Sequence, residues 1–338
     1  MKILYIGHLS GTCRHRMDAL ARLNHEVIPF DLTPYSSFGG RARRWLRWRT
    51  LVGTRVWRLN TTIRAIAPGH TYDLVWCDKA QMLWPSTVRF LRRAGASIVH
   101  YSSDLPSTIR GEPGWQLFRR AVPDYDAVIA PSEGHRTVYR ALGARNLLYL
   151  PFGFEPACHF PPPIDWDDHK RPYDVTFIGS NYENRGAFLL SLVRDFGIKV
   201  HIFGDGWEKS LPAADRTALN VEPGRHGDAY RETLWQSKIS LGFVTHTMAH
   251  ESARRWSEIT ACQSFLLAER TPSAEKWFEP DQEACFFSSV RECAEHIQTA
   301  LTDTPRREAI ARRGRERIAL GNDNDSLMAD VIGRILAL

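Results

Sequence analysis

Short apolar runs alternate with amphipathic segments along the first half of the chain. We expect strands at residues 2–6, 26–30, 74–76, 97–101, 127–130 and 147–150. Apolar residues recur at helical spacing in the segments between them, which we expect to form helices at residues 13–23, 86–93, 115–121 and 133–142. Strands that alternate with helical patterns in this way predict a parallel, doubly wound sheet.

Prolines interrupt this alternation at positions 151, 156, 161, 162, 163 and 172. Neither a central strand nor a helix interior tolerates such a density of proline, so residues 153–172 are predicted to be a linker. Beyond it we expect strands at residues 175–178, 199–203, 239–244 and 265–268, and helices at 185–196, 229–237, 290–301 and 305–318. The octets YDAVIAPS (125–132) and YDVTFIGS (173–180) also begin both halves alike.

The pattern therefore predicts an α/β protein with two doubly wound, Rossmann-like domains that face a cleft, the GT-B arrangement. The predicted parts are a first domain (1–152), the linker, a second domain (173–322) and a final helix (323–338). The final helix carries apolar residues at helical spacing: Met328, Val331, Ile335 and Leu338. By analogy with known two-domain proteins, we expect it to cross back to the first domain.

Composition is that of an ordinary globular protein, with 43% hydrophobic and 24% charged residues. No apolar run approaches the roughly 20 residues that span a bilayer, and the start MKILYIGHLSGTC is too short for a secretory signal. The six cysteines show no spacing typical of a metal site. We therefore expect reduced cysteines and a cytoplasmic protein, with a peripheral location at the inner membrane left open.

A basic segment at 36–70 departs from this average. Residues 32–72 contain no acidic residue. They carry arginines at 41, 43, 44, 47, 49, 55, 58 and 64 and tryptophans at 45, 48 and 57. Residues 38–66 are predicted to form exposed basic helices that engage an anionic membrane surface, a nucleic acid or a phosphorylated acceptor. The alternative is a solvated helix face with inward tryptophans, because Val56, Leu59, Ile63 and Ile66 form a core-facing stripe.

The motifs disfavour two nucleotide-binding classes and favour a third. The chain has neither G-x-G-x-x-G nor a P-loop motif, which argues against a nicotinamide or flavin enzyme and a P-loop NTPase. The strand exit IGSNYENR (178–185) suits a diphosphate. Gly179 and Ser180 permit a close backbone approach, the next helix offers amides, and Arg185 supplies a cation. The same residues also fit an ordinary turn.

The segment RRWSEITACQSFLLAE (254–269) places a charged helix start just before an apolar strand. Glu258 suits the two hydroxyls of a ribose, and Arg255 suits a leaving phosphate. The alternatives are a glutamate held by the helix dipole and an ion pair between Arg255 and Glu251.

His8 and Asp104 follow strands of the first domain and are candidate catalytic groups, which would deprotonate a substrate or stabilise a leaving group. Each also fits a structural role, as a hydrogen-bonded histidine and a turn aspartate. We expect no metal site and no cofactor, and predict a reaction that needs no metal.

Several of these segments resemble the spore-maturation (CgeB-like) glycosyltransferases. The segment 254–269 is similar to their block R-x-F-E-I-x-A-C-G-G-F-L-L-x-E, with Gln263 and Ser264 in place of two glycines. LPFGFEPACHFP (150–161) and IGSNYENR are similar to two further family motifs. Retaining GT-B enzymes often carry Glu-x7-Glu. Here Glu251 stands one residue short of that spacing and His250 takes the slot.

The resemblance implies a glycosyltransferase that moves a sugar from a nucleotide diphosphate sugar to an acceptor that the sequence does not identify. It implies a donor site in the second domain and an acceptor site in the first. Two alternatives stay open: a non-catalytic protein that binds membranes or nucleic acid, and another GT-B enzyme such as an epimerase or a phosphorylase-like protein. The sequence does not indicate the oligomeric state.

Overall fold

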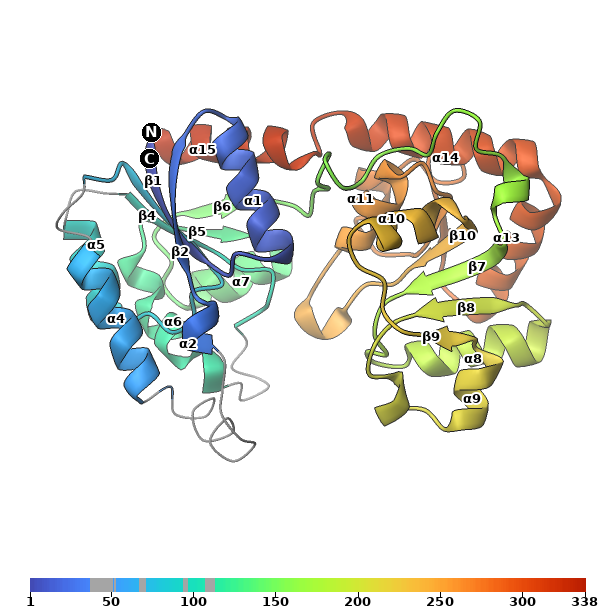
Figure 1. The fold of residues 1–338 in the computed structure, drawn as a ribbon, viewed down its shortest axis with the longest axis horizontal. Helices are drawn as coiled ribbons and strands as arrows, with labels where there is room; N and C mark the ends of the chain where they lie inside the picture. The colour runs from blue at the N-terminus through green and yellow to red at the C-terminus, as the bar shows by residue number, and fades with distance from the viewer. Residues whose placement is uncertain (37–50, 52, 67–70, 94–96, 107–112) are drawn as a thin grey trace. The chain divides into compact units, whose positions relative to one another are not determined.

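The structure, a computed structural model, describes residues 1–36, 51, 53–66, 71–93, 97–106 and 113–338. The chain forms two compact units. Unit 1 comprises residues 1–151 and 324–338, and unit 2 comprises residues 152–323 (Figure 1). Each unit contains a six-stranded parallel sheet.

The sheet of unit 1 has the strand order β2-β1-β3-β4-β5-β6. Its strands are β1 (Lys2–Gly7), β2 (Glu26–Asp31), β3 (Leu74–Asp78), β4 (Ser97–Tyr101), β5 (Ala127–Ala130) and β6 (Leu147–Tyr149). All six predicted strands are present. The central strands are buried on both faces, which is why each reads as a continuous apolar run.

Helices cover both faces of this sheet. They are α1 (Gly11–Arg22), α2 (Thr33–Ser36), α4 (Thr54–Ile66), α5 (Pro85–Arg93), α6 (Gln116–Ala121), α7 (Glu133–Ala141) and α15 (Asn324–Leu336). The core between the sheet and α4 to α7 includes Ile6, Leu59 and Phe118. The opposite core includes Tyr5, Leu20 and Val331 and is covered by α1 and α15.

The C-terminal helix α15 belongs to unit 1, although the whole of unit 2 lies between it and the rest of unit 1 in the sequence. It packs against α1 (Figure 1), and Arg22 pairs with Asp325 at 2.5 Å. The predicted apolar stripe is correct in its first members but not at Leu338, which is 59% exposed. Ile332 is buried instead, because it lies one helical turn from Met328.

The sheet of unit 2 has the strand order β12-β11-β10-β7-β8-β9. Its strands are β7 (Tyr173–Ile178), β8 (Val200–Phe203), β9 (Val221–Glu222), β10 (Ser237–Gly242), β11 (Leu266–Glu269) and β12 (Cys285–Phe287). The two edge strands, β9 and β12, were not predicted; they have two and three residues. The four inner strands were predicted.

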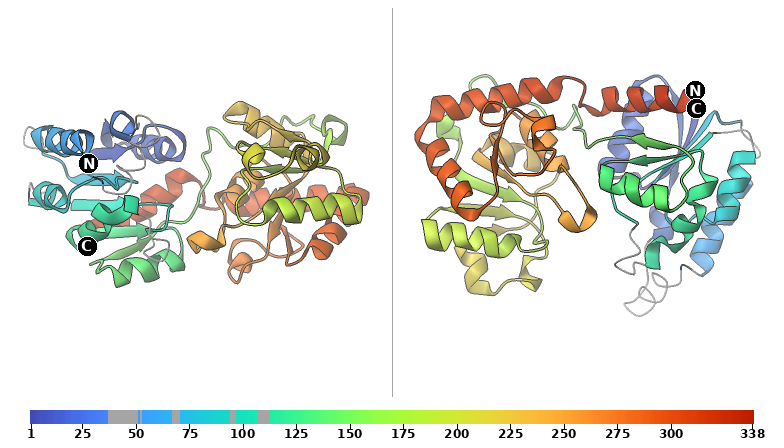
Figure 2. Two further views of the ribbon diagram at one scale, coloured as in Figure 1. Left: turned by 90° about the horizontal axis from the view of Figure 1, so that it is seen from below. Right: turned by 180° about the vertical axis from the view of Figure 1, so that it is seen from behind.

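Helices also cover both faces of this second sheet (Figure 2). They are α8 (Arg185–Phe196), α9 (Ala213–Ala218), α10 (Asp228–Trp235), α11 (Arg254–Ala261), α12 (Ala274–Trp277), α13 (Val290–Thr302) and α14 (Thr304–Ala319). One core, with Phe177 and Phe243, lies under α8 and α13. The other, with Tyr230 and Trp256, lies under α10 and α11.

Most of the basic segment, including residues 37–50, lies outside the described residues. In its described part, Val56, Leu59 and Ile63 are buried as the stripe predicts. Trp57 is 60% exposed, so this tryptophan does not pack inward. Among the described helices, none is both long and apolar enough to cross a bilayer.

Candidate functional site

A polar cluster of unit 2 is built around Glu258, which lies in the middle of α11 and not at the helix start that the sequence predicted. Its carboxylate Oε2 accepts hydrogen bonds from the Tyr230 hydroxyl and from Arg255 Nη1, each at 2.9 Å. The Arg255 guanidinium also lies 4.4 Å from the centre of the Tyr230 ring. The Glu258 side chain is 8% exposed and that of Arg255 is 40% exposed. A buried acid is thus paired with a cation that reaches the surface.

Charge keeps this acid ionised in spite of its burial. Burial alone raises the pKa of Glu258, but Arg255, with His159 and Arg254, outweighs burial and lowers that pKa. Burial likewise disfavours the charged form of Arg255, yet Tyr230 and Glu258 raise its pKa above the ordinary value. At neutral pH the cluster therefore presents a carboxylate acceptor beside a guanidinium.

The turn after β7 holds the predicted diphosphate residues Gly179 and Ser180. The Gly179 amide donates to the Phe203 carbonyl at 3.0 Å, and its carbonyl accepts from Trp207 Nε1 at 2.9 Å. A Cβ atom on Gly204 would lie 2.0 Å from the Gly179 carbonyl oxygen, so glycine is required where these two turns cross. Close packing of the protein with itself therefore explains part of the glycine pattern.

Arg185 begins α8 and holds the loop after β10. Its Nη2 donates to the Val244 carbonyl at 2.9 Å and to Thr245 Oγ1 at 3.1 Å. Burial lowers the pKa of Arg185. The expectation of free amides at this helix start is wrong at its first two residues. The Gly186 amide donates to Asn181 Oδ1, and the amide of Arg185 itself donates to the Tyr182 carbonyl.

The structure places Arg185 and Glu258 on different faces of the sheet. Arg185 lies beside the rings of Phe177 and Phe243, in the core under α8. Glu258 bonds to Tyr230, whose ring belongs to the opposite core. The sequence predicted that both residues follow strand ends at one sheet edge, but it did not predict the face on which each lies.

The loop that leads from β10 to α11 is tied down by carboxylates. Glu269 accepts from the Val244 amide at 3.1 Å and contacts His246 Nε2 at 2.7 Å. Glu183 accepts from the Thr247 amide at 2.9 Å. Glu251 lies in the same loop, where its carbonyl accepts from Thr271 Oγ1 at 2.7 Å. Ser273 Oγ donates to the same carbonyl at 3.2 Å, so both hydrogen bonds are made by the backbone of Glu251.

In unit 1 the two candidate catalytic residues lie near one lysine. His8 follows β1 and is half-buried, and Asp104 follows β4. Lys79, which follows β3, contacts Asp104 Oδ2 at 3.1 Å. Burial lowers the pKa of His8, and Lys79 lowers it further, while Asp31 opposes this shift. A neutral imidazole is the form that a general base requires.

A buried ion pair beside Lys79 was not predicted. Asp78 ends β3, is fully buried and accepts from Arg16 Nε at 2.6 Å. Tyr5 and Cys13 also donate to its carboxylate. Burial raises the pKa of Asp78, but Arg16 outweighs burial and lowers it. The available signal was a charged residue at the end of the apolar run LVWCD (74–78).

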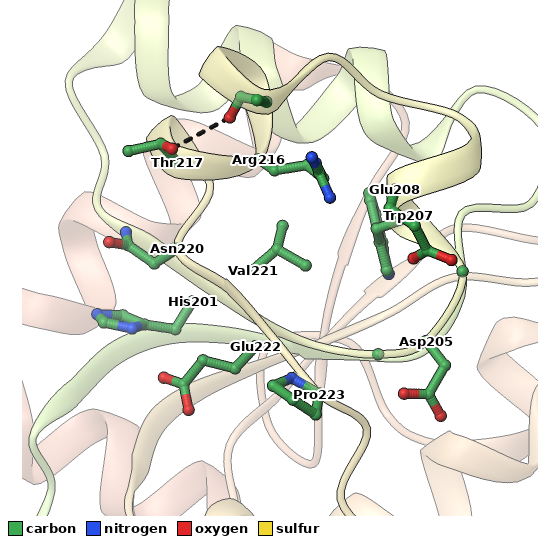
Figure 3. A pocket seen from close by; sticks show the side chains of 13 residues that line it. His201, Asp205, Trp207, Glu208, Arg216, Thr217, Asn220, Val221, Glu222 and Pro223 are labelled. Atoms are coloured by element: carbon green, nitrogen blue, oxygen red, sulfur yellow. Dashed lines mark hydrogen bonds between the residues drawn. The ribbon is translucent and has the colours of Figure 1, made fainter.

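A hollow of unit 2 lies between β8, α9 and β9 (Figure 3). Its volume is about 740 Å³, within the range that ligand pockets occupy. Asp205, Glu222, Arg216, His201 and Asn220 contribute polar side chains to its wall. The sequence analysis missed this hollow because neither α9 nor β9 was predicted.

Comparison with known proteins places these features in a family context. The profile of a family described as "Glycosyl transferase-like" matches residues 185–333. No curated protein matches the chain in sequence.

Solved structures resemble the whole chain. Anabaena HepE in complex with UDP-glucose has a TM-score of 0.66 at 16% identity, covering 100% of each chain. Sucrose-phosphate synthase from Thermosynechococcus elongatus gives 0.70 at 12% identity, with 100% of this chain and 98% of that one covered. A glycosyltransferase from Rickettsia africae gives 0.68 at 11% identity, with 99% and 98% covered.

These likenesses confirm the predicted fold class, two doubly wound α/β domains of the GT-B type. With the match over residues 185–333, they support the predicted class of enzyme, a glycosyltransferase. They support that broad class and do not single out the CgeB-like subfamily.

Proposed function

We propose that the chain transfers a sugar from a nucleoside diphosphate sugar to an acceptor, and that unit 2 binds the donor through Glu258 and Arg255. Glu258 would accept the ribose hydroxyls, and Arg255 would neutralise the leaving phosphate. Gly179, Ser180 and Arg185 are the further donor-site residues of the proposal. We also propose that this enzyme belongs to the CgeB-like subfamily of glycosyltransferases.

One observation carries this proposal: Glu258 is a buried, ionised carboxylate in a helix that follows a parallel strand, and the surface-reaching Arg255 one turn before it is its partner. Burying a charge is costly unless partners compensate it, and Arg255 and Tyr230 do so here. An acceptor fixed in this way suits a pair of vicinal hydroxyls. The complexes of Anabaena HepE with UDP and with UDP-glucose favour a uridine nucleotide.

Arg185 enters the proposal in an indirect role. Because its guanidinium bonds to Val244 and Thr245, it fixes the loop that leads into α11. Removing it would loosen the start of the helix that carries Glu258. We therefore expect Arg185 to act on donor binding by positioning this loop.

Unit 1 would present the acceptor, with His8 as the base and Lys79 and Asp104 beside it. The charge that develops on the departing diphosphate would be stabilised by Arg255 and by backbone amides. This scheme uses no metal. We further propose that the protein is cytoplasmic and associates peripherally with anionic membranes through the basic segment 38–66.

The test is release of nucleoside diphosphate from a panel of UDP-, GDP-, ADP- and dTDP-sugars. We expect one donor to release its nucleotide, faster when a mixture of candidate acceptors is added. An epimerase would convert the sugar without releasing nucleotide. If no donor yields nucleotide with any acceptor fraction, the proposed transfer is wrong.

A further inference from the structure

Three side chains of classic metal-ligand type meet at one end of unit 2, away from the residues proposed to bind the donor. They are Asp281 in the turn after α12, Cys285 at the start of β12 and His296 in α13. Their ligand atoms all lie within 4.8 Å of one another. Among the described residues, this is the group of histidine, cysteine and acidic side chains that meets this criterion.

We propose that Asp281, Cys285 and His296 bind one zinc-type divalent ion that fastens the edge strand β12 to α13. A thiolate, an imidazole and a carboxylate together suit zinc, whereas magnesium and calcium prefer oxygen ligands alone. A water molecule would complete the tetrahedron. This site is independent of the proposed sugar transfer and supplies no group to it.

The distances agree with a shared ion. Cys285 Sγ lies 3.4 Å from Asp281 Oδ1, and His296 Nδ1 lies 4.0 Å from the same oxygen. In a tetrahedral zinc site, bond lengths of about 2.0–2.3 Å place neighbouring ligand atoms roughly 3.3–3.6 Å apart. The first distance matches this value, and the second requires His296 to move by less than an ångström.

The surroundings leave room for an ion and access to it. Cys285 and His296, but not Asp281, line a cavity of about 20 Å³, which is enough for one water-sized occupant. The Cys285 residue is buried, while 53% of the Asp281 side chain and 24% of the His296 side chain are exposed. An ion can therefore enter from the Asp281 side.

Two arginines of α14, Arg306 and Arg307, line the same cavity and oppose a cation there, although Asp168 pairs with Arg307. Arg306 Nη2, on α14, lies 3.9 Å from Asp281 Oδ1, and its side chain is 48% exposed. Zinc would displace this guanidinium toward solvent. We therefore expect Arg306→Gln to bind zinc more tightly than the wild type, because the competing cation is gone.

The experiment uses the full chain, stripped with a chelator and titrated with Zn²⁺ against a chromophoric competitor. We expect one ion per chain, a rise in Tm of about 5–10 °C at saturating zinc, and with Co²⁺ a thiolate charge-transfer band. Cys285→Ser and His296→Gln should each weaken binding at least a hundredfold. The matched controls Cys158→Ser and His226→Gln, which alter a half-buried cysteine and an exposed histidine elsewhere in unit 2, should not.

If Cys285→Ser does not fold, Arg306→Gln still decides the matter. Tighter zinc binding by this variant supports the site. Unchanged or weaker binding overturns it, as does wild-type protein that binds no zinc below about 100 μM or that keeps its cobalt band without Cys285.

Discussion

Replacing Glu258 by glutamine removes one negative charge and keeps the shape of the side chain. The wild-type carboxylate accepts from Tyr230 and Arg255, each at 2.9 Å. It is also buried, so its replacement should lower the stability of the fold as well as the affinity for the donor. Glutamine still accepts one bond, which makes Glu258→Gln a better probe than Glu258→Ala.

The expected losses follow from the number and kind of contacts. A hydrogen bond to a charged group is worth about 1.5–3 kcal/mol, so losing the ribose contacts should raise the Kd for the nucleotide roughly ten- to a hundredfold. The weakened pairing with Arg255 should lower the free energy of unfolding by about 1–3 kcal/mol. Arg255 is 40% exposed and is partly rescued by water, which favours the lower end of that range.

Calorimetric titration with UDP and thermal melting measure the two effects separately. Tyr230→Phe removes the hydroxyl that supports Glu258 but no ligand contact, so it should lower Tm slightly and change Kd little. Glu316→Gln alters an exposed glutamate on α14 of the same unit and serves as the matched control. If Glu258→Gln binds UDP as tightly as the wild type at an unchanged Tm, Glu258 is neither a donor ligand nor a stabilising acid.

Further predictions concern stability, the surface and metal dependence. Asp78→Asn breaks a buried ion pair and should lower the unfolding free energy by about 3–5 kcal/mol in urea titrations. The folded-state pKa of Asp78 is lowered, so its contribution to the free energy of unfolding is present above pH ~4 and is lost as the pH falls below that value. If the free energy of unfolding changed with pH equally in the wild type and in Asp78→Asn between about pH 5 and 3, this would be contradicted. Gln263 has a φ of 54°, where glycine is favoured, so Gln263→Gly should raise the free energy of unfolding by up to about 1 kcal/mol. A lower Tm for this variant would refute the expectation. Arg58→Ala should lower the affinity for anionic liposomes, measured by co-sedimentation, about fivefold, and Trp57→Ala should lower it too. Wild-type protein that stays in the supernatant at low salt would exclude membrane binding. Sugar transfer should persist in chelator, and activity that disappears and returns with magnesium or manganese would show a catalytic metal.

The inner strands were predictable because burial on both faces leaves a continuous apolar run in the sequence. The edge strands β9 and β12, of two and three residues, carry little such signal, although β6, which also has three residues, was predicted. The hollow beside β9 and the cluster beside β12 were missed for the same reason. Asp281, Cys285 and His296 come from a turn, a strand and a helix, so their spacing matches no local motif.

The pairing of Arg255 with Glu258 shows how far local spacing reaches in a candidate site. Residues three apart on a helix are neighbours, so the sequence permits this contact, although the ion pair predicted for Arg255 was with Glu251. Tyr230, the second partner of Glu258, precedes it by 28 residues and comes from another helix. Which face of the sheet carries Arg185 was also set by tertiary packing, which periodicity alone does not specify.

Thermal shift with a panel of nucleoside diphosphates and their sugars tests the central claim most directly, because a ligand that binds the folded chain raises its Tm. We predict a saturable rise with one base, largest for UDP or UDP-sugars, that is reduced in Glu258→Gln and kept in Glu316→Gln. Melting curves that no member of the panel moves at millimolar concentration would contradict a donor site in unit 2.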